Sequence, residues 1–126
     1  MRRRILIVSV MSLLAFATMP ATADIVRLTV PEIKTLLAGN TITGTWSGTS
    51  YRQYFNTDGT TVYVPRNGRV ENGQWRLNTE TDDYESWWRS TGWTPYAMVR
   101  TEAGEYAWVN GDQLEPFTVQ AGRQIE

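Results

Sequence analysis

The periodicity of the chain changes within residues 39–46, which read GNTITGTW. The first two residues, a Gly-Asn pair, form a stop signal for a helix. Ile42, Gly44 and Trp46 then alternate with threonine, and a period of two is typical of a strand with one buried face. The stretch therefore predicts the end of a helix and the beginning of a run of strands.

Upstream of this change, residues 29–38 carry the signals of one short helix. Thr29 and Glu32 have the spacing of a capping box, and Pro31 falls in the first turn, where a missing N–H costs nothing. A helix of this length is unstable alone, so it must dock on the rest of the fold. Four apolar side chains would share its buried face: Val30, Ile33, Leu36 and Leu37.

Residues 1–23 have the three parts of a secretory signal peptide. Arginines occupy positions 2–4, residues 5–17 are mostly apolar, and Ala21-Thr22-Ala23 is a small-residue cleavage box. The apolar run is shorter than the ~20 residues of a membrane-spanning helix, although an uncleaved anchor is the alternative. We predict cleavage after Ala23, a periplasmic or secreted location, and no membrane span in the mature chain.

Downstream of residue 40, turn signals such as Asp58-Gly59, Asn67-Gly68 and Asn72-Gly73 separate short alternating segments. Because the connections are short, neighbours in sequence should pair antiparallel. Residues 24–126 are therefore predicted to form one mainly β domain, a small antiparallel up-and-down β-barrel with the helix on an open end or side. A two-sheet sandwich is the alternative. About eight strands are expected, near residues 41–46, 50–56, 60–65, 70–78, 84–90, 93–101, 105–110 and 114–120.

Composition excludes several kinds of chemistry. The 126 residues include no His and no Cys, which removes disulfides, thiol catalysis and His-based acid–base or metal sites. The formal net charge is −1, and loss of the three signal-peptide arginines leaves nine basic and 13 acidic residues, a net charge of −4. That charge does not favour nucleic acid. The aromatic load, 6 Trp, 6 Tyr and 3 Phe, must supply much of the core.

The segments 39–46, 51–55 and 73–75, together with Tyr84 to Trp88, resemble small proteobacterial exported domains of unknown function. The resemblance implies a compartment and a fold and no activity. Relatives with this pattern often carry a cysteine pair where this chain has Glu85 and Pro95.

More loosely, the Gly44-Thr45-Trp46 opening is similar to lipocalin and calycin-like barrels. That resemblance implies that Trp46 closes one end of the barrel. Arg100 or Arg123 would then stack on this tryptophan.

The densest aromatic cluster surrounds the adjacent Trp87 and Trp88, which must point to opposite faces of a strand. We predict that Trp88 faces inward, because it shares a face with Tyr84 and Ser86. Trp87 then faces outward, where it would lie under the helix, stack on Arg89, or serve as an exposed anchor for a partner.

Other aromatic residues could line a ligand cavity inside the barrel. A small eight-stranded barrel is either filled by its side chains or holds one small ligand, and the short strands and large aromatic volume favour a filled interior. The cavity-lining alternative involves Tyr51, Tyr54, Phe55, Tyr63, Tyr106 and Trp108. The candidate ligand- or partner-binding residues are Tyr51, Tyr54, Trp87, Trp88, Trp93 and Trp108.

We predict no catalytic residue, metal site or cofactor. The acids between Glu80 and Glu85 lack the spacing of a calcium loop and are expected to form a solvated hairpin loop. A pair among Glu71, Glu102 and Glu105 could serve a hydrolase, and that is the remote alternative.

The main hypothesis is a non-enzymatic, monomeric exported domain that binds a small apolar ligand or an envelope protein. The alternative is a secreted inhibitor of a protease or lysozyme that inserts residues 24–30.

Overall fold

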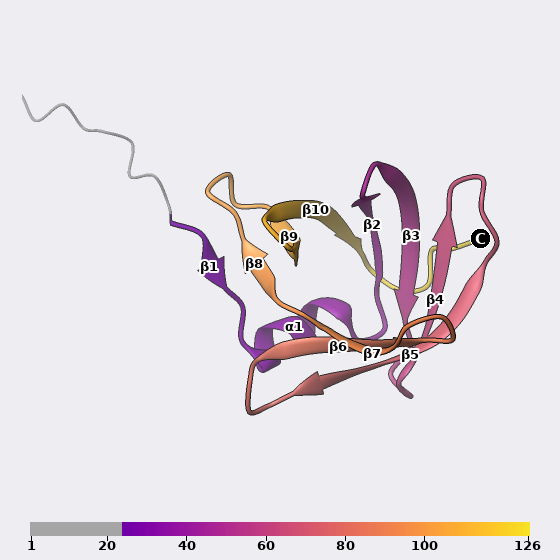
Figure 1. The fold of residues 1–126 in the computed structure, drawn as a ribbon, viewed down its shortest axis with the longest axis horizontal. Coiled ribbons are helices and arrows are strands. Elements are labelled where there is room, and N and C mark those ends of the chain that lie inside the picture. The colour runs from indigo at the N-terminus through magenta and orange to yellow at the C-terminus, as the bar shows by residue number, and fades with distance from the viewer. Residues whose placement is uncertain (1–23) are drawn as a thin grey trace, which may run out of the picture.

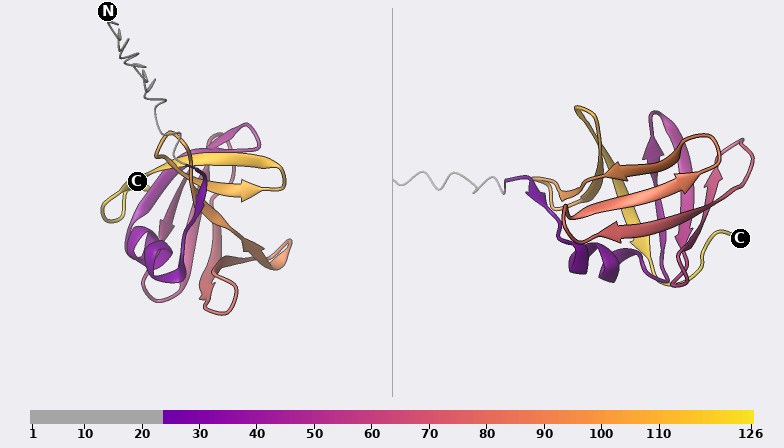
Figure 2. Two further views of the ribbon diagram at one scale, coloured as in Figure 1. Left: turned by 90° about the vertical axis from the view of Figure 1, so that its left-hand side faces the viewer. Right: turned by 60° about the horizontal axis from the view of Figure 1, so that its bottom comes forward.

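The computed structural model describes residues 24–126, and the predicted signal peptide lies outside this part of the chain. One antiparallel sheet curls into a half-barrel with a short helix at one end (Figures 1 and 2). The elements are β1 (Val26–Arg27), α1 (Val30–Leu37), β2 (Thr41–Trp46), β3 (Thr49–Phe55), β4 (Thr60–Pro65), β5 (Glu71–Asn78), β6 (Asp83–Trp88), β7 (Gly92–Tyr96), β8 (Met98–Arg100), β9 (Tyr106–Asn110) and β10 (Gln113–Gln120).

The prediction of a mainly β, antiparallel fold is confirmed, but the closed barrel of about eight strands is wrong. The ten strands follow the order β1-β8-β9-β10-β2-β3-β4-β5-β6-β7, and the edge strands β1 and β7 do not pair with each other. The expected strand 93–101 divides at Ala97, because β7 pairs with β6 whereas β8 pairs with β9. The Ala97 carbonyl accepts a hydrogen bond from Val109 N–H at 3.0 Å, so the chain changes partner within one residue and the ladder is interrupted there.

The remaining pairs follow the expected order. Each of the hairpins from β2 to β7 pairs neighbours in sequence, and β2 also pairs with β10, through Thr43 opposite Thr118. All strands belong to one sheet, so the sandwich alternative is also wrong. Glu85 and Pro95 are register partners on β6 and β7.

The helix forms as its capping signals indicate. Thr29 donates to the Glu32 carboxylate from its N–H at 3.2 Å and from its hydroxyl at 2.9 Å. The chain leaves the helix at Gly39, whose φ of +77° suits a residue without a side chain. Ile33 and Leu37 are fully buried in the core, which supplies the docking that so short a helix needs.

The N-terminal segment of the described chain is built into the sheet. β1 pairs with β8, and the N–H of the buried Leu28 donates to the Met98 carbonyl at 2.8 Å. Residues 24–30 are therefore not the free, projecting segment that the inhibitor hypothesis requires.

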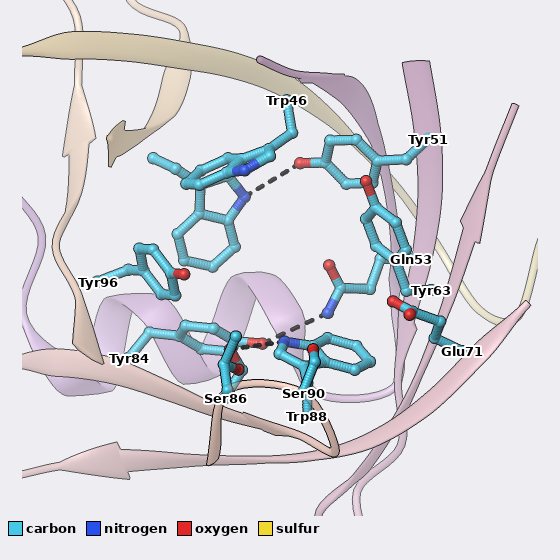
Figure 3. Close-up of a pocket in the computed structure, with 12 residues that line it drawn as sticks. Trp46, Tyr51, Gln53, Tyr63, Glu71, Tyr84, Ser86, Trp88, Ser90 and Tyr96 are labelled. Atoms are coloured by element: carbon cyan, nitrogen blue, oxygen red, sulfur yellow. Dashed lines mark hydrogen bonds between the residues drawn. The ribbon is translucent and has the colours of Figure 1, made fainter. Parts of the chain in front are cut away.

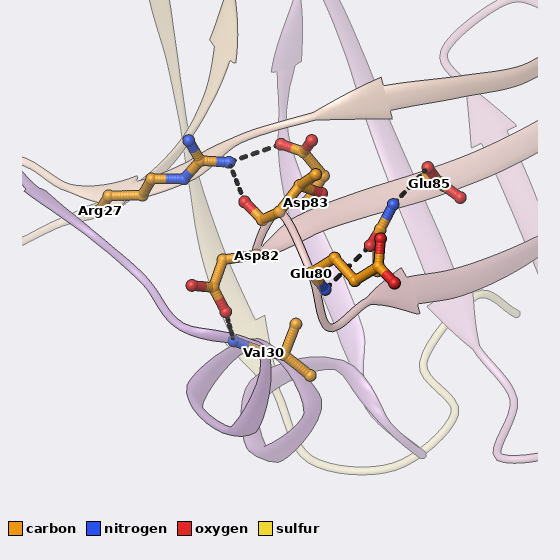
Figure 4. Close-up of polar contacts among 8 residues, drawn as sticks. Arg27, Val30, Glu80, Asp82, Asp83 and Glu85 are labelled. Carbon is orange, nitrogen blue, oxygen red and sulfur yellow. Dashed lines mark hydrogen bonds and ion pairs between the residues drawn. The ribbon is translucent and has the colours of Figure 1, made fainter.

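The acidic loop between β5 and β6 is an exposed hairpin loop, as expected, and it also binds the N-terminal segment (Figure 4). The Arg27 guanidinium donates to the Asp83 carboxylate at 2.6 Å and to the Thr81 carbonyl at 2.9 Å. Asp82 accepts from the Val30 N–H at 3.0 Å, at the first turn of α1. Two acids that resemble loop residues in the sequence thus fasten the N-terminal segment to the β5–β6 hairpin.

The end of the half-barrel that α1 covers is filled with apolar side chains. The buried residues of this end include Leu28, Ile33, Leu37, Ile42, Phe55, Trp75 and Met98.

In the part of the chain that the structure describes, no helix has the length and apolar character needed to cross a membrane.

Candidate functional site

The end of the half-barrel opposite α1 holds a cavity of about 260 Å³. It lies where β2, β4 and β6 end and where β3, β5 and β7 begin, beside the hairpin connections (Figure 3). Its lining residues are Trp46, Tyr51, Gln53, Tyr63, Glu71, Tyr84, Ser86, Trp88, Ser90, Thr91, Tyr96 and Trp108.

The strand alternation places the inward tryptophan of β6 at this cavity. Trp88 lines it, as predicted, and its ring lies against β5 at Gly73, where an added Cβ would meet the ring at 2.6 Å. The same Cβ would also clash with the backbone carbonyl of Trp87. Glycine at position 73 is therefore what allows the indole to enter the interior.

Seven of the twelve lining residues are Tyr or Trp, and their rings contact one another around the cavity. Tyr51 and Tyr63 stack at 5.1 Å between ring centroids, and Tyr63 meets the Trp88 ring edge-on at 5.9 Å. Trp46 and Tyr96 make a further edge-on pair at 5.4 Å. Ring pairs of this kind add about 0.5–1.5 kcal/mol each beyond their burial, so the aromatic wall is preformed.

The buried polar groups of the wall bind one another. Trp108 Nε1 donates to the Tyr51 hydroxyl at 3.1 Å, and Trp88 Nε1 donates to Ser86 Oγ at 3.1 Å. Both indole N–H groups are therefore satisfied within the protein and are not left to face a ligand.

Gln53 links the cavity to the sheet behind it. Its amide nitrogen donates to Thr61 Oγ1 at 3.0 Å and to the Tyr84 hydroxyl at 3.4 Å, and its carbonyl oxygen points into the cavity (Figure 3). This side chain is 6% exposed and held in place, so it offers a fixed hydrogen-bond acceptor.

Burial raises the pKa of the Tyr51 phenol and that of the Tyr84 phenol well above the ordinary value of 10. Burial also raises the pKa of Tyr63, and the negative charge of Glu71 adds to that rise. The phenols of the wall are consequently neutral over the physiological pH range.

The structure separates the six predicted site residues into two sets. Tyr51, Trp88 and Trp108 line the cavity, whereas Tyr54, Trp87 and Trp93 do not. The expectation of a filled interior is confirmed for the α1 end of the half-barrel and is wrong for the end with the cavity.

The outer-face tryptophans lie beside each other in the register of β6 and β7. Trp87 faces Trp93 and Gln74 across the strands, as expected for an outward residue, and it is half-buried. α1 is held at Asp82, which precedes β6 and lies five residues before Trp87, and Trp87 does not belong to the core that packs on the helix. Among residues 24–126, the arginine that stacks on this face is Arg76, over Trp93 at 3.8 Å, and not Arg89.

Tyr54 also lies outside the cavity. The Arg123 guanidinium stacks over its ring at 5.4 Å. Arg100 stacks on Tyr106 at 5.2 Å, so neither arginine contacts Trp46 as the lipocalin resemblance implies. Trp46 instead packs edge-on against Tyr96 at the cavity.

Several lining residues were missed from the sequence, including Gln53, Glu71 and Tyr96. Gln53 could have been found, because it lies two residues from both Tyr51 and Phe55 and so shares their face of β3. Glu71 shares a face of β5 with the buried Gly73 and Trp75, and Tyr96 lies opposite Tyr84 in the register of β6 and β7, so a period of two places both on the inner face as well.

The carboxylates offer no paired acid–base arrangement at the cavity. Glu71 is the one lining residue with an acidic side chain, and Glu102 and Glu105 belong to the β8–β9 turn region. Within residues 24–126, no group of three or more Asp or Glu side chains is placed to hold a metal ion.

Comparison with known proteins adds no family to this description. No family model matches the chain, and no curated protein and no solved structure matches it.

Proposed function

We propose that this protein is an exported, non-enzymatic domain that binds one compact small molecule in the cavity of the half-barrel. The observation that carries the proposal is the preformed aromatic wall around a 260 Å³ space that contains a fixed polar acceptor, Gln53. Ligand sites are typically concave, largely apolar and preformed, with a few polar groups that orient the ligand.

The size of the cavity bears on the ligand. Small-molecule pockets span roughly 300–1,000 Å³, and 260 Å³ lies just below that range. The cavity therefore suits a compact molecule better than a long acyl chain. Its polar rim, with Glu71, Ser90 and Thr91, suits an amphipathic ligand better than the purely apolar one expected from the sequence.

Binding rather than catalysis is supported by the chemistry of the wall. General acid–base catalysis needs a titratable group whose pKa lies near the working pH. The buried phenols have raised pKa values and stay neutral, and the chain has no His and no Cys. Export is supported by the signal-peptide pattern of residues 1–23.

A plug at the cavity mouth tests the proposal. Ser90 is exposed in the β6–β7 turn and lines the cavity, so Ser90→Trp should fill the opening without disturbing the core. In ligand-observed NMR with a library of small amphipathic fragments, we expect hits for the purified protein and at least a tenfold weaker response for Ser90→Trp.

Ala103→Trp is the matched control, because it adds the same ring to the exposed β8–β9 turn, away from the cavity. It should bind as the parent does. Absence of fragment binding, or equal binding by Ser90→Trp and the parent, would refute ligand binding in the cavity.

A protein partner at the outer face is the second candidate. Trp93 is 38% exposed there, and such a ring is a common anchor. Arg76 already covers this ring, and Glu85 holds that arginine at 2.6 Å, so the face is partly satisfied within the protein. The inhibitor alternative has lost its free segment, because β1 is paired. The cavity is therefore the better-supported site.

A further inference from the structure

We infer that the cavity takes a small organic cation, a compact quaternary or methylated ammonium group. This inference rests on the proposed function, because it names the ligand class of the same site. It follows from the aromatic rings that line the cavity, the carbonyl oxygen of Gln53 and the one acidic side chain of the lining.

The aromatic wall provides the main attraction. A cation over the face of a Trp or Tyr ring is attracted by the negative face of the π-system, and several such rings form the cages that recognise methylated ammonium groups. Tyr51, Tyr63, Trp88 and Trp108 come from β3, β4, β6 and β9 and surround one space. No single element could supply a ring on so many sides.

The polar groups at the cavity favour a positive guest over a negative one. The carbonyl oxygen of Gln53 points inward (Figure 3), and the indole N–H groups of Trp88 and Trp108 are already donated to Ser86 and Tyr51. Gln53 therefore presents an oxygen acceptor to the cavity, and two of the three indole N–H groups around it are occupied within the protein.

The one charged side chain that lines the cavity, among the described residues, is acidic. Glu71 lines the cavity, and none of the described residues that line it is Lys or Arg. Three arginines on the flanking turns, Arg66, Arg69 and Arg89, are exposed, as Glu71 is, but they do not line the cavity. The net charge of −4 expected for the mature chain adds a weak general attraction for cations.

Choline and its neutral isostere, 3,3-dimethylbutan-1-ol, separate charge from shape. Titrations of the purified protein, followed by protein-observed NMR, should show choline binding at least about tenfold more tightly than the alcohol. Glu71→Gln should weaken choline binding about three- to fivefold and leave binding of the alcohol unchanged. Glu102→Gln, an exposed change of the same type on the β8–β9 turn, should alter neither.

The outcomes distinguish the two proposals. Equal binding of choline and the alcohol, or choline binding that Ser90→Trp does not reduce, refutes the cation inference. If the fragment library still binds in a Ser90-dependent way, the proposed function stands without it. If neither compound and no fragment binds, both proposals fail together.

Discussion

At the scale of single residues, Gly73 shows how one missing side chain shapes the interior. In the sequence, Asn72-Gly73 has the composition of a hairpin turn. In the structure the pair lies inside β5. The Trp88 ring and the Trp87 carbonyl occupy the space that a Cβ at position 73 would need. The glycine serves close packing rather than a turn, and the cavity depends on it through Trp88.

We therefore predict that Gly73→Ala lowers the free energy of unfolding by about 1–3 kcal/mol, the usual cost of overpacking. The displaced indole should also change the tryptophan emission of the folded protein. Chemical denaturation followed by fluorescence measures both effects. A variant with parental stability and emission would contradict the packing described here.

At the scale of elements, α1 depends on the β5–β6 hairpin. The helix is short, and the Val30 N–H in its first turn donates a hydrogen bond to the carboxylate of Asp82. Asp82 has a φ of +59°. A side chain in this left-handed region is unusual, and Asp and Asn tolerate it best. The hairpin thus caps the Val30 N–H of α1, in addition to the local capping box of Thr29 and Glu32.

Two substitutions at Asp82 separate the acceptor from the backbone conformation. Asp82→Gly keeps the left-handed conformation and removes the carboxylate, so it should lower the free energy of unfolding by about 1 kcal/mol. Asp82→Asn keeps an oxygen acceptor and should cost less than about 0.5 kcal/mol. Thermal and urea denaturation measure the difference, and equal stability of the two variants would show that the acceptor contributes nothing.

In β4, a period of two does not show which face of the strand is buried, and contacts with the neighbouring strand β3 decide it. Val62 and Val64 alternate with Thr61 and Tyr63, and either pair could face the core. The structure turns Thr61 and Tyr63 inward, because the buried Thr61 hydroxyl donates to the Tyr54 carbonyl and accepts from Gln53. A hydroxyl with partners is tolerated in the core.

At the scale of the whole molecule, one end of the half-barrel is a packed core and the other is a cavity with buried phenols. Tyr51 and Tyr84 are only 4% and 3% exposed. Because burial raises the pKa of both phenols, the free energy of unfolding depends on pH in the alkaline range. Above pH 10 the unfolded state loses these protons before the folded state does. The unfolded state then binds fewer protons, so stability must fall as pH rises.

Stability should be insensitive to these two phenols below about pH 9 and should fall above pH 10, by up to about 1.4 kcal/mol per pH unit for each. Tyr51→Phe removes one of the two groups and should make the fall shallower by up to that amount. Urea denaturation between pH 8 and 11.5 measures both slopes. Identical slopes for the parent and Tyr51→Phe would show that Tyr51 ionises equally well in both states.

By itself, the sequence determined the helix, the antiparallel hairpins from β2 to β7 and the inward orientation of Trp88. Each of these rests on local signals: the Thr29–Glu32 capping box, short connections, and a side-chain period of two. Only the tertiary structure decided the break at Ala97, the hydrogen bond from Val30 in α1 to Asp82, and the meeting of Gln53 with rings from six strands. The physical reason is that these features depend on the curvature of the sheet, which brings together residues far apart in the chain and has no local pattern.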